Sequence, residues 1–296
     1  MRAGPSRAAT VCAIAIAAIS SVAGSAGQPS VSDVVARLDA YLVVYEPQIS
    51  ELIANETMTQ ERSLAPSHAF LAREALTLAP SRARRRIRSE VAFVALPNNA
   101  GWLGFRHVKS VNNRRVEDAS ASLTKTLQLQ GFDAAESLLK TSAQFNIGLP
   151  RTTNLPNLPL EFLHQHNRNR MVMRLDGTER VRGVETTQVV FVEGSKPTLI
   201  QNPNEGDMPS VVRAWVDARG RLLRAEVNTF ASADAVEPSS RIRVEFAEHK
   251  ALGMLVPSEM RETFPVEPPA RGYGVATYSN FRRFQTAARI VPVPQS

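Results

Sequence analysis

The chain has 296 residues, of which 43% are hydrophobic and 21% charged, and it carries a formal net charge of +7 at pH 7. This composition is ordinary for a globular protein and excludes a disordered chain or a bundle of membrane helices. Antiparallel sheet proteins of this size are often one domain. Because no internal repeat or clear linker divides the sequence, we expect a single domain after the N-terminal segment.

The N-terminal segment has the layout of a secretory signal peptide. Arg2 and Arg7 precede an apolar run over residues 11–18, and the small residues 23–26 follow. The run is short and rich in alanine for a membrane span, although an uncleaved anchor is the alternative. We therefore predict that residues 1–26 are a signal peptide and that the mature protein is periplasmic or secreted.

The one cysteine, Cys12, lies inside this apolar run. A lipoprotein would need its cysteine at the cleavage point, so a lipid anchor is disfavoured. The mature chain would hold no cysteine, which excludes disulfides, thiolate metal sites and a cysteine nucleophile. Its stability must then come from the hydrophobic core.

Helical spacing of apolar residues marks the start of the mature chain, over residues 32–45. Ser30 or Ser32 can cap this helix, and Pro47 interrupts its end. Residues 49–62 are ambiguous between a continued helix and a first strand. We favour a passage from helix to strand.

Two strands are predicted next, over residues 87–96 and 102–111, and the second leads into a tight turn over residues 111–114. Between the helix and these strands lies a cluster of arginines, which are Arg82, Arg84, Arg85, Arg86 and Arg88. Such a cluster is typical of a solvated basic strand entry or of a surface for anionic membrane lipids. We do not expect a nucleic-acid partner, because the chain is predicted to be exported.

From residue 119 to about residue 145 the pattern becomes helical, which predicts a helical insertion. The prolines of residues 149–159 exclude long regular structure there, so we expect this stretch to cross from one end of the sheet to another. Two further strands are predicted over residues 171–175 and 186–192, before a long polar loop over residues 194–209.

The clearest pattern is an antiparallel meander over residues 211–284. In residues 241–246, Ile242, Val244 and Phe246 alternate with charged residues, which is the period of two expected when one sheet face is buried and the other wet. Gly220 can take the positive φ that the first hairpin turn requires. The sequence therefore predicts a mainly antiparallel α+β fold.

No catalytic motif stands out. His164 and His166 would share one face of a strand, but two ligands do not make a metal site. Acidic pairs such as Glu259 and Glu262 lie among arginines, and cross-strand charge pairing explains them. Neither a nucleophile elbow nor a phosphate loop is present. We therefore predict a protein that is not an enzyme and needs no metal or cofactor.

Methionines and aromatic residues are scattered along the predicted strands, and ordinary core packing is the default explanation for most of them. If helices cover the concave face of the sheet incompletely, these side chains would instead line an apolar cavity suited to an acyl chain. The lining residues predicted on this basis are Phe93, Trp102, Phe105, Trp215, Met254 and Met260.

The meander also resembles a known family. The matching stretches are residues 213–217, 220–226, 243–246, 253–260 and the ending 276–284. They are similar to the C-terminal half of LolA/LolB-like proteins, which sort outer-membrane lipoproteins, and to related exported bacterial proteins. The resemblance implies a strongly curved, incomplete β-barrel with helices on its concave face and an apolar cavity for lipid tails. The helical insertion and the proline-rich crossing depart from the short carriers and put lipoprotein transfer itself in doubt.

Three functions remain open from the sequence. The first is an exported carrier or binding protein for a lipid-like ligand, which predicts an open apolar cavity. The second is an envelope interaction or scaffold protein whose own helices fill the cavity. The third is a hydrolase whose site is assembled from distant residues, which predicts a polar cleft.

Overall fold

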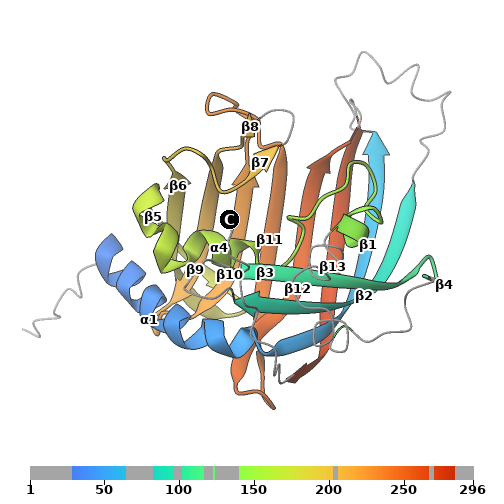
Figure 1. Cartoon of the computed structure of the whole chain (residues 1–296). Coiled ribbons are helices and arrows are strands. Elements are labelled where there is room, and N and C mark those ends of the chain that lie inside the picture. Colours follow the sequence, from blue (N-terminus) through green and yellow to red (C-terminus); the bar gives the residue numbers. More distant parts are fainter. Residues whose placement is uncertain are drawn as a thin grey trace, which may run out of the picture.

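The computed structural model describes residues 29–64, 83–95, 102–116, 123, 140–202, 206–266 and 270–283. Most of them belong to one 11-stranded antiparallel sheet. Its strands, in sheet order, are β4 (Arg114–Arg115), β3 (Trp102–Val111), β2 (Arg84–Ala95), β1 (Leu52–Leu64), β13 (Ala270–Arg283), β12 (Met254–Pro265), β11 (Ser240–His249), β10 (Leu222–Thr229), β9 (Ser210–Asp217), β6 (Val184–Glu193) and β5 (Met171–Val181). The outer strands β4 and β5 do not pair with each other, so the described sheet is open (Figure 1).

The meander predicted from the alternating sequence is confirmed. Strands β9 to β13 follow each other in the sheet in chain order, and Gly220 takes a φ of +81° in the first hairpin turn. A Cβ at Gly220 would lie 2.2 Å from the carbonyl oxygen of Arg37, so this glycine also lets the N-terminal helix approach the turn. Residues 284–296 lie outside the described part of the chain.

The N-terminal helix, α1 (Val31–Ile49), confirms the helical spacing. Ser30 caps it through a capping box with Asp33. Pro47 lies inside the last turn, and the helix continues to Ile49, where the N–H of Ser50 still reaches the carbonyl of Glu46 at 3.1 Å. The buried side chains of α1 form one stripe, made of Val34, Val35, Leu38, Leu42, Tyr45 and Ile49. Among the described residues, no helix is long and apolar enough to cross a membrane.

The remaining predicted strands are also present. Strands β2 and β3 match the predicted segments, and Asn112 and Asn113 take positive φ in the tight turn between β3 and β4. Strands β5 and β6 are longer than predicted, and the turn at Arg182 and Gly183 joins them. The loop over residues 194–209 contains a small two-stranded sheet, β7 (Gln201–Asn202) and β8 (Gly206–Asp207).

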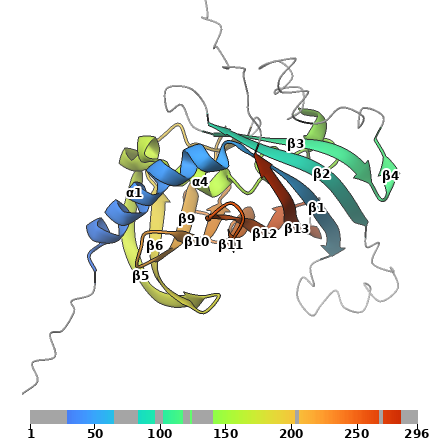
Figure 2. The ribbon, with the colours of Figure 1, turned by 90° about the horizontal axis from the view of Figure 1, so that it is seen from below.

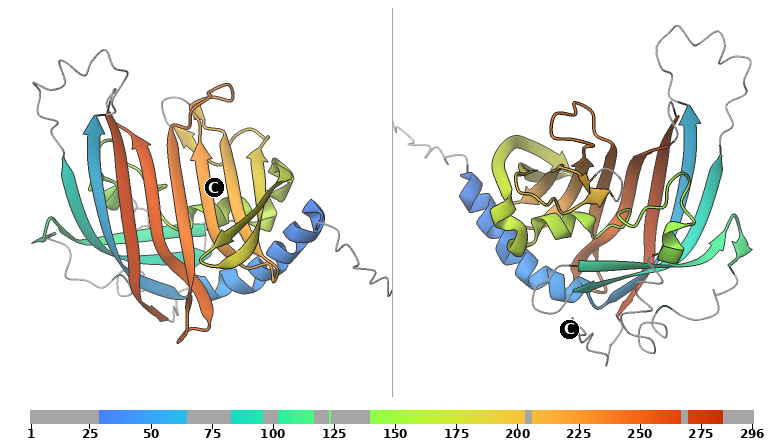
Figure 3. Two further views of the ribbon diagram at one scale, coloured as in Figure 1. Left: turned by 180° about the vertical axis from the view of Figure 1, so that it is seen from behind. Right: turned by 45° about the horizontal axis from the view of Figure 1, so that its top comes forward.

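The sheet is strongly curved, and helices cover its concave side. Figure 2 shows the strands as an arc, with α1 and the short helix α4 (Leu158–Leu163) on its inner side. A 3₁₀ turn, η2 (Gln165–Arg170), connects α4 to β5. Seen from behind, the middle strands carry no described helix (Figure 3). This arrangement confirms the predicted fold class, an open and curved antiparallel sheet with helices on its concave face.

Two sequence-based expectations fall largely outside the described residues. The predicted signal peptide lies within residues 1–28, which are not described. Of the predicted helical insertion over residues 119–145, the structure describes Leu123 and residues 140–145, of which 140–143 are helical. The side chain of Leu123 is fully buried, and its N–H donates to Glu90 at 3.0 Å.

Candidate functional site

The concave face is apolar along most of the sheet. Paired residues of neighbouring strands lie on the same face of the sheet. On the concave face, this pairing brings apolar residues together in one continuous layer. Buried members of this layer include Met58, Phe93, Ala214, Val227, Val244 and Met260. The buried stripe of α1 packs against it, and the ring of Tyr45 meets Phe246 edge-on at 6.4 Å between centroids.

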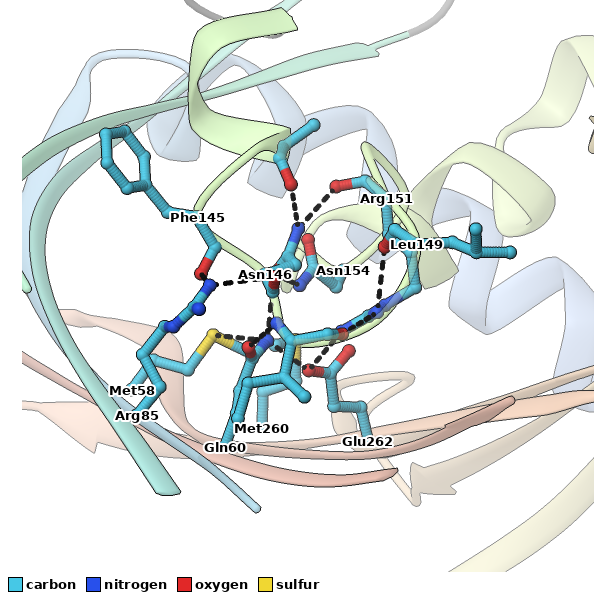
Figure 4. Close-up of polar contacts among 12 residues, drawn as sticks. Met58, Gln60, Arg85, Phe145, Asn146, Leu149, Arg151, Asn154, Met260 and Glu262 are labelled. Atoms are coloured by element: carbon cyan, nitrogen blue, oxygen red, sulfur yellow. Dashed lines mark hydrogen bonds and ion pairs between the residues drawn. The ribbon is translucent and has the colours of Figure 1, made fainter. Parts of the chain in front are cut away.

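The proline-rich crossing predicted over residues 149–159 lies over this face until α4 begins at Leu158. We call the wider stretch of residues 144–157 the crossing segment. Close to its start, the side chain of Asn146 meets Gln60 of β1 (Figure 4): the Gln60 amide donates to Asn146 Oδ1 at 2.8 Å and to Glu262 of β12 at 2.9 Å, and its oxygen accepts from the N–H of Ile147 at 2.8 Å. One fully buried glutamine therefore joins the crossing segment to two strands.

A buried ion pair holds the other end of the crossing segment. Arg106 of β3 donates to both carboxylate oxygens of Glu56 on β1, at 2.6 and 2.8 Å. The same guanidinium donates to the side-chain and backbone oxygens of Asn154, at 3.0 and 2.7 Å. The hydroxyl of Tyr278 donates to Glu56 at 3.2 Å. Both carboxylate oxygens of Glu56 therefore accept hydrogen bonds from within the protein, as a buried charge requires.

A second buried ion pair links Arg151 of the crossing segment to Glu262, at 3.3 Å. The guanidinium of Arg151 also stacks on Phe264, 3.5 Å from the ring centroid. Burial raises the pKa of Glu262, although the nearby charges of Arg151 and Arg106 oppose the rise. Burial likewise lowers the pKa of Arg151. The sequence suggested ordinary cross-strand pairing for Glu262, and that interpretation is wrong, since its partners come from the crossing segment and from β1.

The strand β3 is shaped to receive the crossing segment at Gly104. A Cβ at this position would lie 2.4 Å from Asn157 Oδ1 and 2.7 Å from Leu155 Cδ1. A larger residue at this position would force the side chains of Leu155 and Asn157 to shift. The crossing segment therefore fills the concave face at the β1–β3 end of the sheet and is held there by polar contacts as well as by packing.

The structure divides the predicted arginine cluster. Arg85 reaches the concave side, where it donates to the backbone oxygens of Phe145 and Asn146 at 2.7 and 2.9 Å (Figure 4). The prediction that Arg85 belongs to a membrane-facing surface is therefore wrong. Arg84, Arg86 and Arg88 are exposed, and Arg82 lies outside the described residues.

Beside the middle strands of the sheet, a pocket of about 190 Å³ remains between α1 and the hairpin of β11 and β12. Its walls are Tyr41, Val44, Tyr45, Gln48, Arg221, Glu248, Gly253, Met254 and Leu255. The rings of Tyr41 and Tyr45 stack at 5.1 Å. Both hydroxyl groups are buried without a hydrogen-bond partner among the described residues, and burial raises the pKa of each.

The six predicted lining residues do not lie together. Phe93 and Met260 are fully buried on the concave face, and Met254 lines the pocket. Phe105 pairs with Ala92. The residues before and after Ala92 on β2 face the concave side, so Ala92 and its partner Phe105 face the convex side. The side chain of Trp102 lies outside the described part.

Trp215 is likewise on the convex face, so its predicted place in a concave lining is wrong. Its indole N–H donates to Glu179 at 2.7 Å. The guanidinium groups of Arg224 and Arg243 lie 5.2 and 5.9 Å from the ring. These contacts make Trp215 part of an ion-pair network on the outer surface.

The histidine pair lies where α4 meets η2. His164 caps η2 instead of lying in a strand, and its Nδ1 accepts from the N–H of His166 at 3.1 Å. Its Nε2 lies 3.4 Å from Glu46 of α1. Within the described residues, no group of three or more His, Cys, Asp or Glu side chains is placed to hold a metal ion.

The sequence missed the buried polar network of the concave face. Glu56 and Gln60 flank Met58 at alternating positions of β1, which places all three on one face. The signal available in the sequence was that these two polar residues share a strand face with an apolar methionine. Polar side chains on a buried face need hydrogen-bond partners, so their position indicated a buried polar network.

No protein-family model and no curated protein matches this chain. Solved structures do resemble it. A DUF1329 family protein from Desulfovibrio piger is 10% identical, with 86% of this chain and 94% of that chain covered and a TM-score of 0.42. A LolA superfamily protein from Nitrosomonas europaea is 11% identical, with 87% and 95% covered and a TM-score of 0.33. A LolA superfamily protein is thus among the solved structures to which this chain is similar.

Proposed function

We propose that this protein is a non-catalytic carrier or binding protein for a lipid-like ligand in the bacterial envelope. The observation that supports this proposal is the pocket between α1 and the β11–β12 hairpin, which lies beside the apolar concave face. Its walls combine aromatic and aliphatic side chains with the polar residues Gln48, Arg221 and Glu248. Tyr45 belongs both to the pocket wall and to the core beneath it. A ligand chain that enters here would meet hydrophobic surface on two sides.

The walls of the pocket suit an amphiphile. Burial of an acyl chain contributes about 0.8 kcal/mol per methylene. The buried hydroxyls of Tyr41 and Tyr45 offer hydrogen bonds to a polar group of the ligand, since they have no partner among the described residues. The pocket of about 190 Å³ is smaller than most small-molecule sites. It therefore admits one end of a chain, and a longer ligand requires α1 to move outward.

Two neighbouring residues of α1 provide a matched test. Val43 and Val44 are 63% and 59% exposed, but only Val44 lines the pocket. Val44→Trp should fill the pocket and lower the uptake of a fluorescent fatty acid at least tenfold, whereas Val43→Trp should leave it unchanged. Equal uptake by both variants would refute the proposed binding site.

The second candidate is an envelope scaffold or interaction protein whose cavity is filled by its own chain. The observation that favours it is the buried polar network, which fixes the crossing segment over the β1–β3 end of the concave face. If the protein takes up neither fatty acids nor phospholipids, this second function becomes the better explanation.

A further inference from the structure

The arginine cluster seen in the sequence forms a row on the outside of the sheet. Because Arg85 reaches the concave side, strand alternation sends Arg84, Arg86 and Arg88 to the convex face. All three side chains are exposed. At about 3.4 Å per residue, the row extends about 14 Å along β2.

The neighbouring hairpin of β3 and β4 adds a fourth arginine to this face. Arg115 pairs with Ser110, which pairs in turn with Arg88. Cross-strand partners share one face of a sheet, so Arg88 and Arg115 flank Ser110 at about 10 Å from each other. Arg115 is exposed. We call Arg84, Arg86, Arg88 and Arg115 the convex arginine patch.

The patch holds more positive charge than its described neighbours neutralise. Arg84 pairs with Glu61 at 3.3 Å, but no described residue forms an ion pair with Arg86, Arg88 or Arg115. Some arginines elsewhere on the sheet do have acidic partners. Arg261 pairs with Glu259 at 2.7 Å, and Arg174 pairs with Asp176.

We propose that the convex arginine patch docks the protein on a bilayer that contains anionic phospholipids. The patch lies on the outward side of a curved sheet, so its guanidinium groups form a raised surface and not a groove that would follow a nucleic-acid strand. Four arginines spread over about 14 by 10 Å match a planar array of lipid phosphates. Tyr273, which is 47% exposed and pairs with Glu61, adds an amphipathic ring of the kind found at membrane interfaces.

This docking does not depend on the proposed carrier function. The patch lies on the convex face over β2 to β4, whereas the pocket lies between α1 and the hairpin of β11 and β12, which are middle strands of the sheet. A protein docked through the patch would therefore keep the pocket open to the solvent. Loss of membrane binding and loss of ligand uptake can be measured separately.

The test is cosedimentation of the full chain with vesicles of phosphatidylethanolamine and phosphatidylglycerol, compared with vesicles of phosphatidylcholine alone. Each arginine near an anionic surface contributes a factor of about five to partitioning, so Arg86→Gln with Arg88→Gln should lower the partition coefficient about 25-fold. The matched control, Arg174→Gln with Arg261→Gln, removes the same charge from arginines that already have an acidic partner. Its effect should be much smaller.

Added salt should weaken the binding of the unaltered protein, because exposed charges are screened within about 10 Å at moderate ionic strength. Equal losses in the two double variants would overturn the proposal, since net charge alone would then drive binding. Equal binding to phosphatidylcholine vesicles would also overturn it, as would binding to heparin without binding to anionic vesicles. All four substitutions are at partly or fully exposed side chains, and circular dichroism checks that each variant is folded.

Discussion

The replacement of Arg106 by methionine tests whether the buried ion pair fixes the crossing segment. Arg106→Met keeps much of the side-chain volume but removes two hydrogen bonds to Glu56 and two to Asn154. Glu56, which is 1% exposed, would lose its cation. Removal of one partner of a buried ion pair costs about 3–5 kcal/mol, because the other charge stays in a poorly solvating environment. We expect the free energy of unfolding to fall by this amount.

The double variant Arg106→Met, Glu56→Met separates a charge effect from a packing effect. Replacement of a whole buried pair by apolar residues is often close to neutral, and the lost partners of Tyr278 and Asn154 cost about 1 kcal/mol each. The double variant should therefore be more stable than either single variant. Urea unfolding followed by circular dichroism and tryptophan fluorescence gives the free energies where the two transitions coincide. Single variants within about 1 kcal/mol of the unaltered protein would refute this account of the ion pair.

Two further predictions concern the same fold. Gly104→Ala should destabilise the protein by about 1–3 kcal/mol and speed amide hydrogen exchange in residues 145–157, because its Cβ would overlap Leu155 and Asn157. Gly194→Ala, whose Cβ meets nothing closer than 3.8 Å, is the control, and equal effects of the two would contradict the prediction. Burial opposes ionisation of Glu226, but hydrogen bonds from Asn228 and Arg243 outweigh it and hold the pKa below the ordinary 4.5. Glu226→Gln should therefore cost about 1.5–3 kcal/mol at neutral pH, a difference that disappears as the pH falls through the lowered folded-state pKa; a difference that persists unchanged at low pH would contradict this.

Local patterns were enough to predict most of the secondary structure. The helical spacing of α1 and the alternation in β9–β13 depend on residues a few positions apart, which a sequence displays directly. The turns at Gly220 and at Asn112 and Asn113 followed from residues that tolerate positive φ. These elements and their order were predicted correctly.

The contents of the concave face could not be predicted in the same way. Gln60 meets partners 86 and 202 residues away in the chain, and no local pattern announces such contacts. Alternation separates the two faces of a strand but does not say which face is concave. Phe105 and Trp215 were assigned to the concave face for this reason, since residues on both faces are buried in these parts of the sheet.

The most direct test of the proposed carrier function is native mass spectrometry of the protein purified from an exporting bacterial host, followed by solvent extraction and lipid analysis. We expect a lipid bound in a one-to-one complex, which is absent from Val44→Trp and present in Val43→Trp. A protein that carries no bound lipid and also fails to take up fluorescent fatty acids or phospholipids would contradict the carrier function. That result would favour a scaffold whose cavity is filled by the crossing segment.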